Sequence, residues 1–340
     1  MRMGPMNNRL KISYLIGLVL IMPLALAETD TETESFMPAY DSNCLRNGIL
    51  SLPPETPLAD IRKQCLVKDN KPTEPSAVEQ RLQSQRFNKN DQFSLQTYLP
   101  NYVLLDSFHF SGVNDQPFSD QFLKDERFDP LEIKFQFSVK VPISDNFIGV
   151  GDHWFVGYTN RSFWQAYNHH ISSPFRETNH QPEGWISFDN QWNFLGWKNR
   201  LIDVGLIHQS NGKPGSLSRS WNRGFLRFVF EQGNSAFVIK PWIRIPESAS
   251  SDDNADISYY LGRSEFLYAT KYSDHHYRVM LRNNFNEKRN KGAIELGYSF
   301  PVHRNLNFYA QWFYGYGESL IDYNYLNNTL SIGVQLGNLL

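Results

Sequence analysis

Apolar and polar side chains alternate along much of the chain from Phe93 onward. The alternation is continuous over 131–141, where Leu, Ile, Phe and Val alternate with Glu, Lys, Gln and Ser, and it recurs over 294–300, 305–312 and 330–337. Because neighbouring side chains of a β-strand point to opposite faces of the sheet, each run predicts a strand with one apolar and one polar face.

Runs of this kind, separated by turn-rich segments, predict about twelve strands. They are expected near 94–105, 131–143, 153–167, 180–192, 199–211, 221–233, 236–247, 256–270, 275–286, 291–302, 305–317 and 328–340. An even number of antiparallel strands can close, and strands of about 9–11 residues with one apolar face can cross a bilayer. The pattern therefore predicts an all-β fold, a twelve-stranded antiparallel transmembrane β-barrel. A soluble β-sandwich has the same period, but long strands with Trp, Tyr and Phe near their ends favour the barrel.

The first 27 residues have the features of a secretory signal peptide. Three basic residues precede the apolar run 12–27, which ends in Ala25-Leu26-Ala27. This pattern predicts cleavage after Ala27 and export of the chain. An uncleaved membrane anchor is the alternative, but the run is shorter than the roughly 20 residues that a spanning helix needs, and Pro23 interrupts it.

Residues 28–92 are polar and show little periodicity, which predicts a periplasmic extension that precedes a barrel domain over 93–340. The two cysteines, Cys44 and Cys65, both lie in this extension. An exported chain meets an oxidising compartment, so we expect a local disulfide rather than a metal site, since no histidine cluster accompanies the pair.

Charge and composition argue against a nucleic-acid partner and are compatible with a lipid partner. Its formal net charge is −2, without the basic footprint that a nucleic-acid partner requires. Aromatic residues make up 15% of the sequence, and no long apolar helical stretch follows residue 27. These features favour a chain that contacts membrane lipid through strands rather than helices.

One predicted strand carries a candidate for chemistry. Alternate residues from Ile202 to Leu206 form an apolar stripe, and His208 and Ser210 continue it on the same face. Side chains two residues apart in a strand project to one side roughly 6.5–7 Å apart, so a nucleophile and its base can lie within mutual reach. If the stripe faces lipid, so does the histidine–serine pair.

A third residue joins this pair across a predicted hairpin. The turn-forming segment 211–216 leads into a second strand, and a turn centred near Gly215 places position 222 opposite 208. Asn222 then lies on the same outward face as His208. Serine needs a neighbouring base, and the base needs a partner that fixes its tautomer, so Ser210, His208 and Asn222 fit these roles in that order.

Most His-x-Ser pairs on strands are ordinary polar positions. On a lipid-facing surface that interpretation is less satisfactory, because exposing polar side chains to lipid costs free energy. Three polar side chains that converge there therefore indicate a site. The sequence contains no G-x-S-x-G elbow, zinc motif or phosphate loop that would indicate a catalytic site elsewhere. The three residues therefore mark a candidate catalytic site.

The same residues carry a resemblance to a known family. His208-Gln209-Ser210-Asn211-Gly212, followed by Ser218-Arg219-Ser220-Trp221-Asn222, is similar to the outer-membrane phospholipase A family of Gram-negative bacteria. The resemblance spans roughly 93–340. Further matching segments are Tyr158-Thr159, Ser162, Trp164-Gln165, 172–179, Lys240-Pro241-Trp242 and Asp252-Asp253-Asn254.

The resemblance implies a calcium-dependent phospholipase of A1/A2 and lysophospholipase type, with phospholipid as its substrate. It implies Ser210 as nucleophile, His208 as general base, Asn222 as the residue that orients the histidine, and the backbone N–H of Gly212 in the oxyanion hole together with a calcium-bound water. It also implies an active homodimer. The implied Ca²⁺ ligands are Ser172, the carbonyl oxygen of Lys213, Ser218 and Asp253.

The sequence departs from the family pattern at three of its positions. The family has arginine where Lys213 stands, which leaves a backbone ligand intact. It carries an aspartate where this chain has Gly215, which predicts weaker calcium binding by the monomer. It carries a glutamine at the dimer contact where this chain has Asn160, which predicts a shortened or lost polar interaction.

Two other functions remain open at this point. A non-enzymatic barrel, acting as a pore or structural protein, would show the same strands, although inward Glu132, Lys134, Arg223 and Arg227 could pair and fill a small lumen. An acyltransferase would use the same acyl-enzyme and pass the chain to an acceptor other than water. Release of free fatty acid distinguishes hydrolysis from transfer.

Overall fold

The computed structural model describes residues 50, 53, 57–65, 75–87, 93–123, 126–149, 151–250 and 252–337. The chain forms two compact units, 1–74 and 75–340, and helix α2 (Leu58–Gln64) belongs to the first. No helix within the described ranges is long and apolar enough to cross a membrane. The predicted signal peptide and Cys44 lie outside the described residues, so cleavage after Ala27 and the Cys44–Cys65 disulfide stay predictions.

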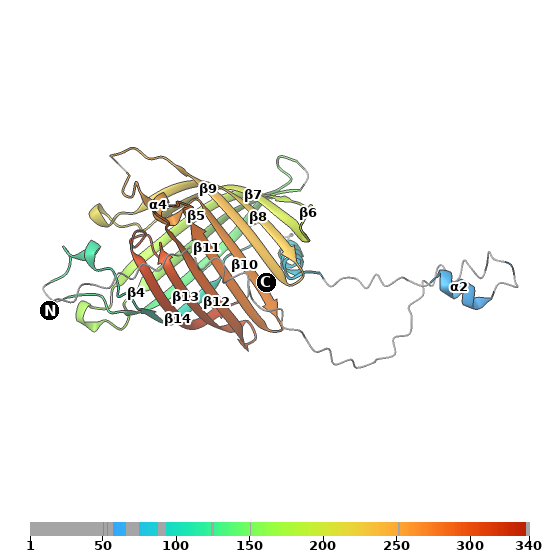
Figure 1. The fold of residues 1–340 in the computed structure, drawn as a ribbon, viewed down its shortest axis with the longest axis horizontal. Helices are drawn as coiled ribbons and strands as arrows, with labels where there is room; N and C mark the ends of the chain where they lie inside the picture. The colour runs from blue at the N-terminus through green and yellow to red at the C-terminus, as the bar shows by residue number, and fades with distance from the viewer. Residues whose placement is uncertain are drawn as a thin grey trace. The chain divides into compact units, whose positions relative to one another are not determined.

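The second unit is a sheet of long antiparallel strands that curves into a barrel (Figure 1). Its strands are β1 (Gln96–Thr97), β2 (Asn101–His109), β3 (Leu131–Asp145), β4 (Asp152–Trp164), β5 (Phe175–Asp189), β6 (Asn193–Phe194), β7 (Trp197–Ser210), β8 (Ser220–Gln232), β9 (Ser235–Ile245), β10 (Ser264–Tyr272), β11 (His275–Asn283), β12 (Gly292–His303), β13 (Leu306–Tyr316) and β14 (Leu326–Leu336). Short helices interrupt the connections: η3 (Gln116–Phe118), η4 (His169–Ile171), η5 (Gly215–Leu217) and α4 (Ile257–Leu261).

Twelve of these strands close the barrel. β2 pairs with β14 on one side and with β3 on the other, and β3 also pairs with β4, so the sheet returns to its start. The two-residue strands β1 and β6 only add to β3 and β7. The prediction of a twelve-stranded antiparallel barrel is confirmed.

Two predicted strands begin later than expected. The strand expected from residue 94 begins at Asn101 as β2, because residues 96–97 pair separately with β3 and Pro100, which has no N–H to donate, precedes it. The strand expected from 256 begins at Ser264 as β10, because 257–261 form helix α4. Ile257 and Leu261, four residues apart, are both buried on one face of that helix.

The strands alternate between the lumen and the outer surface as the sequence predicts. In β3, Glu132, Lys134, Gln136 and Ser138 are buried inside, whereas Phe137 is 51% exposed. The inward charges pair across the lumen, as in the Lys134 Nζ–Glu318 Oε1 contact of 2.9 Å. The remaining interior includes a cavity of about 270 Å³, so ion pairs and polar side chains fill much of the barrel.

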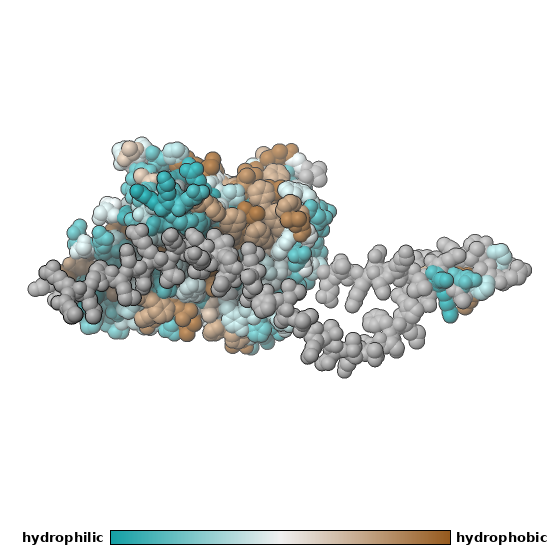
Figure 2. Space-filling view, viewed as in Figure 1, coloured by the Kyte–Doolittle hydropathy of each residue, from teal (hydrophilic) through white to brown (hydrophobic). Residues whose placement is uncertain are grey.

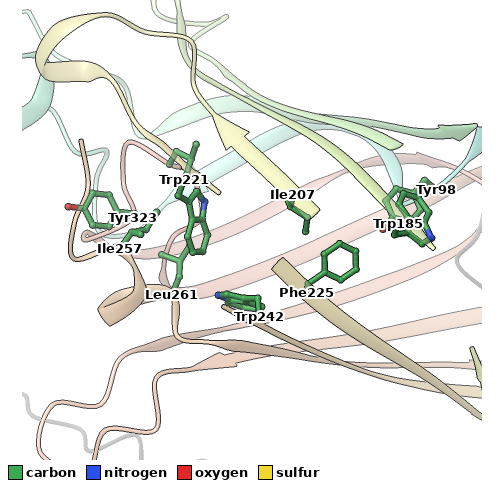
Figure 3. Packing of buried hydrophobic residues seen from close by; sticks show 10 residues of the cluster. Tyr98, Trp185, Ile207, Trp221, Phe225, Trp242, Ile257, Leu261 and Tyr323 are labelled. Atoms are coloured by element: carbon green, nitrogen blue, oxygen red, sulfur yellow. The ribbon is translucent and has the colours of Figure 1, made fainter. Parts of the chain in front are cut away.

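An aromatic cluster supports the β7–β8 hairpin from the inside (Figure 3). Ile207 of β7 and Trp221 of β8 are buried there, and Figure 3 shows Trp221 beside Ile257 and Leu261 of α4. The indole N–H of Trp221 donates to Gln209 Oε1 at 2.9 Å, which ties the two strands together. Because residues 207, 209 and 221 are held inside, the outward side chains of 208, 210 and 222 are carried on a rigid support.

Part of the predicted extension is helical and contacts the barrel. Helix α3 (Ala77–Phe87) lies in the second unit, where Glu79 pairs with Arg200 and Ser76 donates to Glu231. The guanidinium of Arg81 donates to the carbonyl of Tyr98 at 2.8 Å. Residues 75–87 therefore belong to the same compact unit as the strands.

Candidate active site

The hairpin of β7 and β8 brings the predicted base and its partner into contact. His208 and Asn222 are directly paired across the two strands, so the register predicted from the turn is confirmed. The Nδ1–H of His208 donates to Asn222 Oδ1 at 2.8 Å. Since the amide oxygen only accepts, this contact fixes the tautomer in which His208 Nε2 is free to accept a proton.

Ser210 lies two residues beyond His208 on the same outward face, at the last position of β7. Apolar side chains lead up to this pair along the strand, with Val204 45% and Leu206 62% exposed. Ile243 of β9 is a further exposed apolar residue, and Figure 2 shows hydrophobic residues gathered over β8 and β9. The candidate site therefore lies on an apolar outer surface of the barrel.

The loop after Ser210 is shaped by one buried side chain. Asn211 Nδ2 donates to the carbonyl of Leu217 at 2.8 Å, and Asn211 Oδ1 accepts the N–H of Arg219 at 3.0 Å. Gly212 follows with a φ of +64°, a conformation that strains residues with a Cβ. The loop thus holds a backbone N–H beside the serine in a conformation that glycine supplies.

Two of the predicted calcium ligands meet next to this loop. Ser218 Oγ donates to Asp253 Oδ2 at 2.5 Å, although 35 residues separate them in sequence. The Asp253 loop is anchored on both sides, since Arg244 pairs with Asp252 at 2.5 Å and Asn254 Oδ1 accepts the N–H of Ser220 at 3.0 Å. An exposed carboxylate and a hydroxyl, both oxygen donors, suit a hard cation.

The other two predicted ligands lie in adjoining loops. Ser172 ends η4 in a left-handed conformation with a φ of +60°, immediately before β5. Lys213 Nζ donates to the carbonyl of Arg176 at 2.7 Å, which links the β7–β8 loop to the start of β5. Burial lowers the pKa of the Lys213 ammonium, and Glu177 opposes that shift. No group of three or more His, Cys, Asp and Glu side chains suited to a metal occurs in the described part of the chain, and the predicted set contains one carboxylate.

Comparison with known proteins identifies the family. The chain matches the family model for phospholipase A1 over residues 78–336. The phospholipase A1 of Salmonella typhimurium is 35% identical over 252 residues, which cover 73% of this chain and 83% of that protein. The chain belongs to the phospholipase A1 family.

Solved structures of relatives share the barrel of this family member. The outer membrane phospholipase dimer of Salmonella typhi with bound calcium is 34% identical, with a TM-score of 0.68, and covers 74% of this chain and 94% of that one. Outer membrane phospholipase A of Escherichia coli, solved as an active-site mutant with asparagine replaced by alanine, is 33% identical, with a TM-score of 0.68, over 74% of this chain and 95% of that one. This family member is an outer-membrane β-barrel protein of the Gram-negative type.

The structure adds two side chains that the sequence did not single out. Asn222 Nδ2 donates to Glu247 Oε1 at 3.1 Å, so the amide that contacts His208 is itself held by a residue just after β9. His180 of β5 is paired directly with Ser210 of β7. Neither residue shows a local signal, because each reaches the site through a strand or loop distant in sequence.

Proposed function

We propose that this family member is a calcium-dependent phospholipase that hydrolyses phospholipid acyl esters through Ser210, His208 and Asn222. The contact of His208 Nδ1 with Asn222 Oδ1 on the outward face, beside Ser210, is the observation that carries the proposal. An active-site asparagine in the Escherichia coli relative supports the same assignment. The outer leaflet of the membrane is where such a site meets its substrate.

In the proposed mechanism Ser210 Oγ attacks the acyl carbonyl carbon as His208 Nε2 accepts the hydroxyl proton. The tetrahedral intermediate carries its negative charge on the former carbonyl oxygen, where the N–H of Gly212 donates. Collapse breaks the ester bond, and His208 returns the proton to the departing lysophospholipid alcohol. Water then hydrolyses the acyl-enzyme by the same base, and Asn222 holds His208 in its productive tautomer throughout.

The open position of the site supports action on more than one ester. Ser210 and His208 lie on the outer surface of the barrel rather than in an enclosed pocket. We therefore extend the proposal to both acyl esters, A1 and A2, and to lysophospholipid. The proposal assigns this domain to 93–340, the periplasmic extension to 28–92 and the signal peptide to 1–27.

Ser218 and Asp253 are the residues that would hold calcium, together with Ser172 and the carbonyl of Lys213. The 2.5 Å contact between Ser218 and Asp253 supports the first two as neighbours of one ion. Calcium bound there would supply positive charge beside the developing oxyanion. The chain's own loop, held by Asn211, keeps Gly212 and Lys213 in place for that arrangement.

A homodimer is the proposed active state. The Salmonella typhi relative is a calcium-bound dimer. Exposed apolar residues beside the site, including Leu206 and Ile243, give a second copy or an acyl chain an apolar surface to cover. Two barrels brought together there would remove the ester from water.

Fatty-acid release from detergent-dispersed phospholipid tests the proposal directly. Wild type is expected to release free fatty acid with calcium and to lose that activity with a chelator, and Ser210→Ala is expected to be inactive in both. Absence of release by refolded, dimeric wild type would overturn the proposal. An acylated lipid acceptor in place of free fatty acid would indicate transfer rather than hydrolysis.

A further inference from the structure

His180 lies beside the proposed nucleophile, between it and two polar residues of β4. Its register partners are Asn160 on β4 and Ser210 on β7. The neighbouring Asn179 and Gln181 line the internal cavity, so His180 projects to the outer face. Directly paired residues of antiparallel strands have Cβ atoms about 4.5–5.5 Å apart. The imidazole is therefore a near neighbour of the Ser210 side chain.

Two polar side chains of β4 contact one edge of the ring at Nδ1. The hydroxyl of Tyr158 lies 2.7 Å from His180 Nδ1, and the amide Nδ2 of Asn160 donates to the same nitrogen at 3.4 Å. Ser162 Oγ in turn donates to Asn160 Oδ1 at 3.0 Å. Because Nδ1 accepts from an amide, the proton of the neutral ring is on Nε2.

The opposite edge of the ring faces the proposed oxyanion site. A Cβ atom added to Gly212 would lie 3.9 Å from His180 Cδ2, the carbon bonded to Nε2. The Nε2–H is thus on the side of the ring that approaches the Ser210–Gly212 segment. The imidazole therefore turns its Nε2 edge toward the Ser210–Gly212 segment, where an Nε2–H can donate a hydrogen bond.

We propose that His180 is a further oxyanion donor, the second from the protein after the Gly212 N–H, for the ester hydrolysed at Ser210, an inference that rests on the proposed function. When Ser210 Oγ bonds to the acyl carbon, the carbonyl π electrons move to its oxygen and His208 takes the serine proton. His180 Nε2–H donates to that oxygen and keeps its own proton. A donor placed before the reaction and outside bulk water stabilises this charge most where it develops.

A histidine–tyrosine pair on the barrel surface does not by itself indicate catalysis. His275 of β11 makes the same kind of contact, with Nδ1 2.8 Å from the hydroxyl of Tyr298 and the two rings stacked. That pair lies four strands from β7 in the sheet order. What distinguishes His180 is its register with Ser210 and the position of its Cδ2, 3.9 Å from where a Cβ of residue 212 would lie. His275 is therefore the matched control.

The test compares His180→Phe, His180→Gln and His275→Phe with wild type, all refolded and assayed with calcium. Phenylalanine keeps a planar ring without a donor, whereas glutamine keeps an N–H. Each variant is assayed on diacyl phosphatidylcholine in detergent and on a p-nitrophenyl fatty-acid ester, which has the reacting carbonyl but no phosphate. Melting temperature and chemical crosslinking establish that fold and dimer are retained.

Loss of an oxyanion donor is expected to lower kcat by about 10²-fold with little change in KM, because the contact strengthens in the transition state. His180→Phe should show this loss on both substrates, His180→Gln should recover part of it, and His275→Phe should match wild type. A loss confined to phosphatidylcholine would overturn the inference in favour of headgroup binding. Unchanged kcat in a folded His180→Phe would overturn it too, whereas an inactive wild type would instead refute the proposed function.

Discussion

His208 Nδ1 and Asn222 Oδ1 lie 2.8 Å apart because the two residues are exact register partners of β7 and β8. The partner of the base is a neutral amide at a surface that faces lipid. A carboxylate in that position would need to be desolvated whenever substrate or a second barrel covered the site, and that costs more than desolvating an amide. An asparagine can orient the histidine without this cost.

The first prediction concerns this amide. Asn222→Ala removes the acceptor for His208 Nδ1–H, so the ring can adopt the wrong tautomer, and kcat for fatty-acid release should fall by no more than the roughly 10²–10⁴-fold that a general base supplies. Leu226→Ala, a change at an exposed apolar position on the same face of β8, is the control and should retain activity. Equal kcat in Asn222→Ala and Leu226→Ala would show that the contact does not orient the base.

A second prediction concerns Glu247. Its Oε1 accepts a hydrogen bond from Nδ2 of the Asn222 amide at 3.1 Å. Glu247→Ala should lower kcat by roughly 2- to 10-fold, the equivalent of one hydrogen bond of about 0.5–1.5 kcal/mol. The effect should disappear in an Asn222→Ala background, because Glu247 acts only through the amide. Additive losses in the double variant would argue that Glu247 acts elsewhere.

Local periodicity was enough to predict the strands, their faces and the hairpin register, because each depends on neighbours in sequence. Helix α4 was not predicted, since Ile257, Tyr259 and Leu261 alternate like strand residues, and only the structure shows that Ile257 and Leu261 are buried together on one helix face. His180 was not predicted as part of the site because its place depends on the order of β4, β5 and β7 around the barrel. Residues brought in by non-local pairing left no signal in the local pattern.

A third prediction concerns stability. Arg176 is buried in the lumen, where it pairs with Glu132 at 2.8 Å and with Asp322 at 2.6 Å. Arg176→Ala leaves the buried Asp322 without its cation and leaves the buried Glu132 with His109, 2.8 Å away, as its remaining ion-pair partner. The loss should reduce the free energy of unfolding by about 3–5 kcal/mol. Guanidinium unfolding in detergent, followed by tryptophan fluorescence, measures this change.

The exposed Arg289 supplies the control for that experiment, and Arg289→Ala should alter stability by no more than about 0.5 kcal/mol. Adding Asp322→Asn to Arg176→Ala should restore part of the loss, because it removes the carboxylate that has no other cation beside it. A double variant as unstable as the sum of both single variants would contradict the assignment of the loss to the unpaired carboxylate.

The last prediction concerns calcium and the glycine at 215. Gly215 has a φ of +59°, and a Cβ added there would meet nothing within 4 Å, so the loop has room for a side chain. Asp and Asn tolerate this conformation better than most residues. Gly215→Asp adds a carboxylate where the outer-membrane phospholipase A pattern has one, and it should lower the calcium concentration needed for half-maximal activity. Asp253→Asn should raise that concentration, because it removes the charge beside Ser218.

Gly215→Asn separates charge from shape, since it imposes the same side-chain volume and backbone strain without the negative charge. It should leave the calcium requirement close to that of wild type, and calorimetric titration of calcium should rank the variants in the same order as activity does. A calcium requirement that is unchanged in both Gly215→Asp and Asp253→Asn would place the ion elsewhere. An equal shift in Gly215→Asp and Gly215→Asn would instead assign the effect to the conformation of the β7–β8 loop.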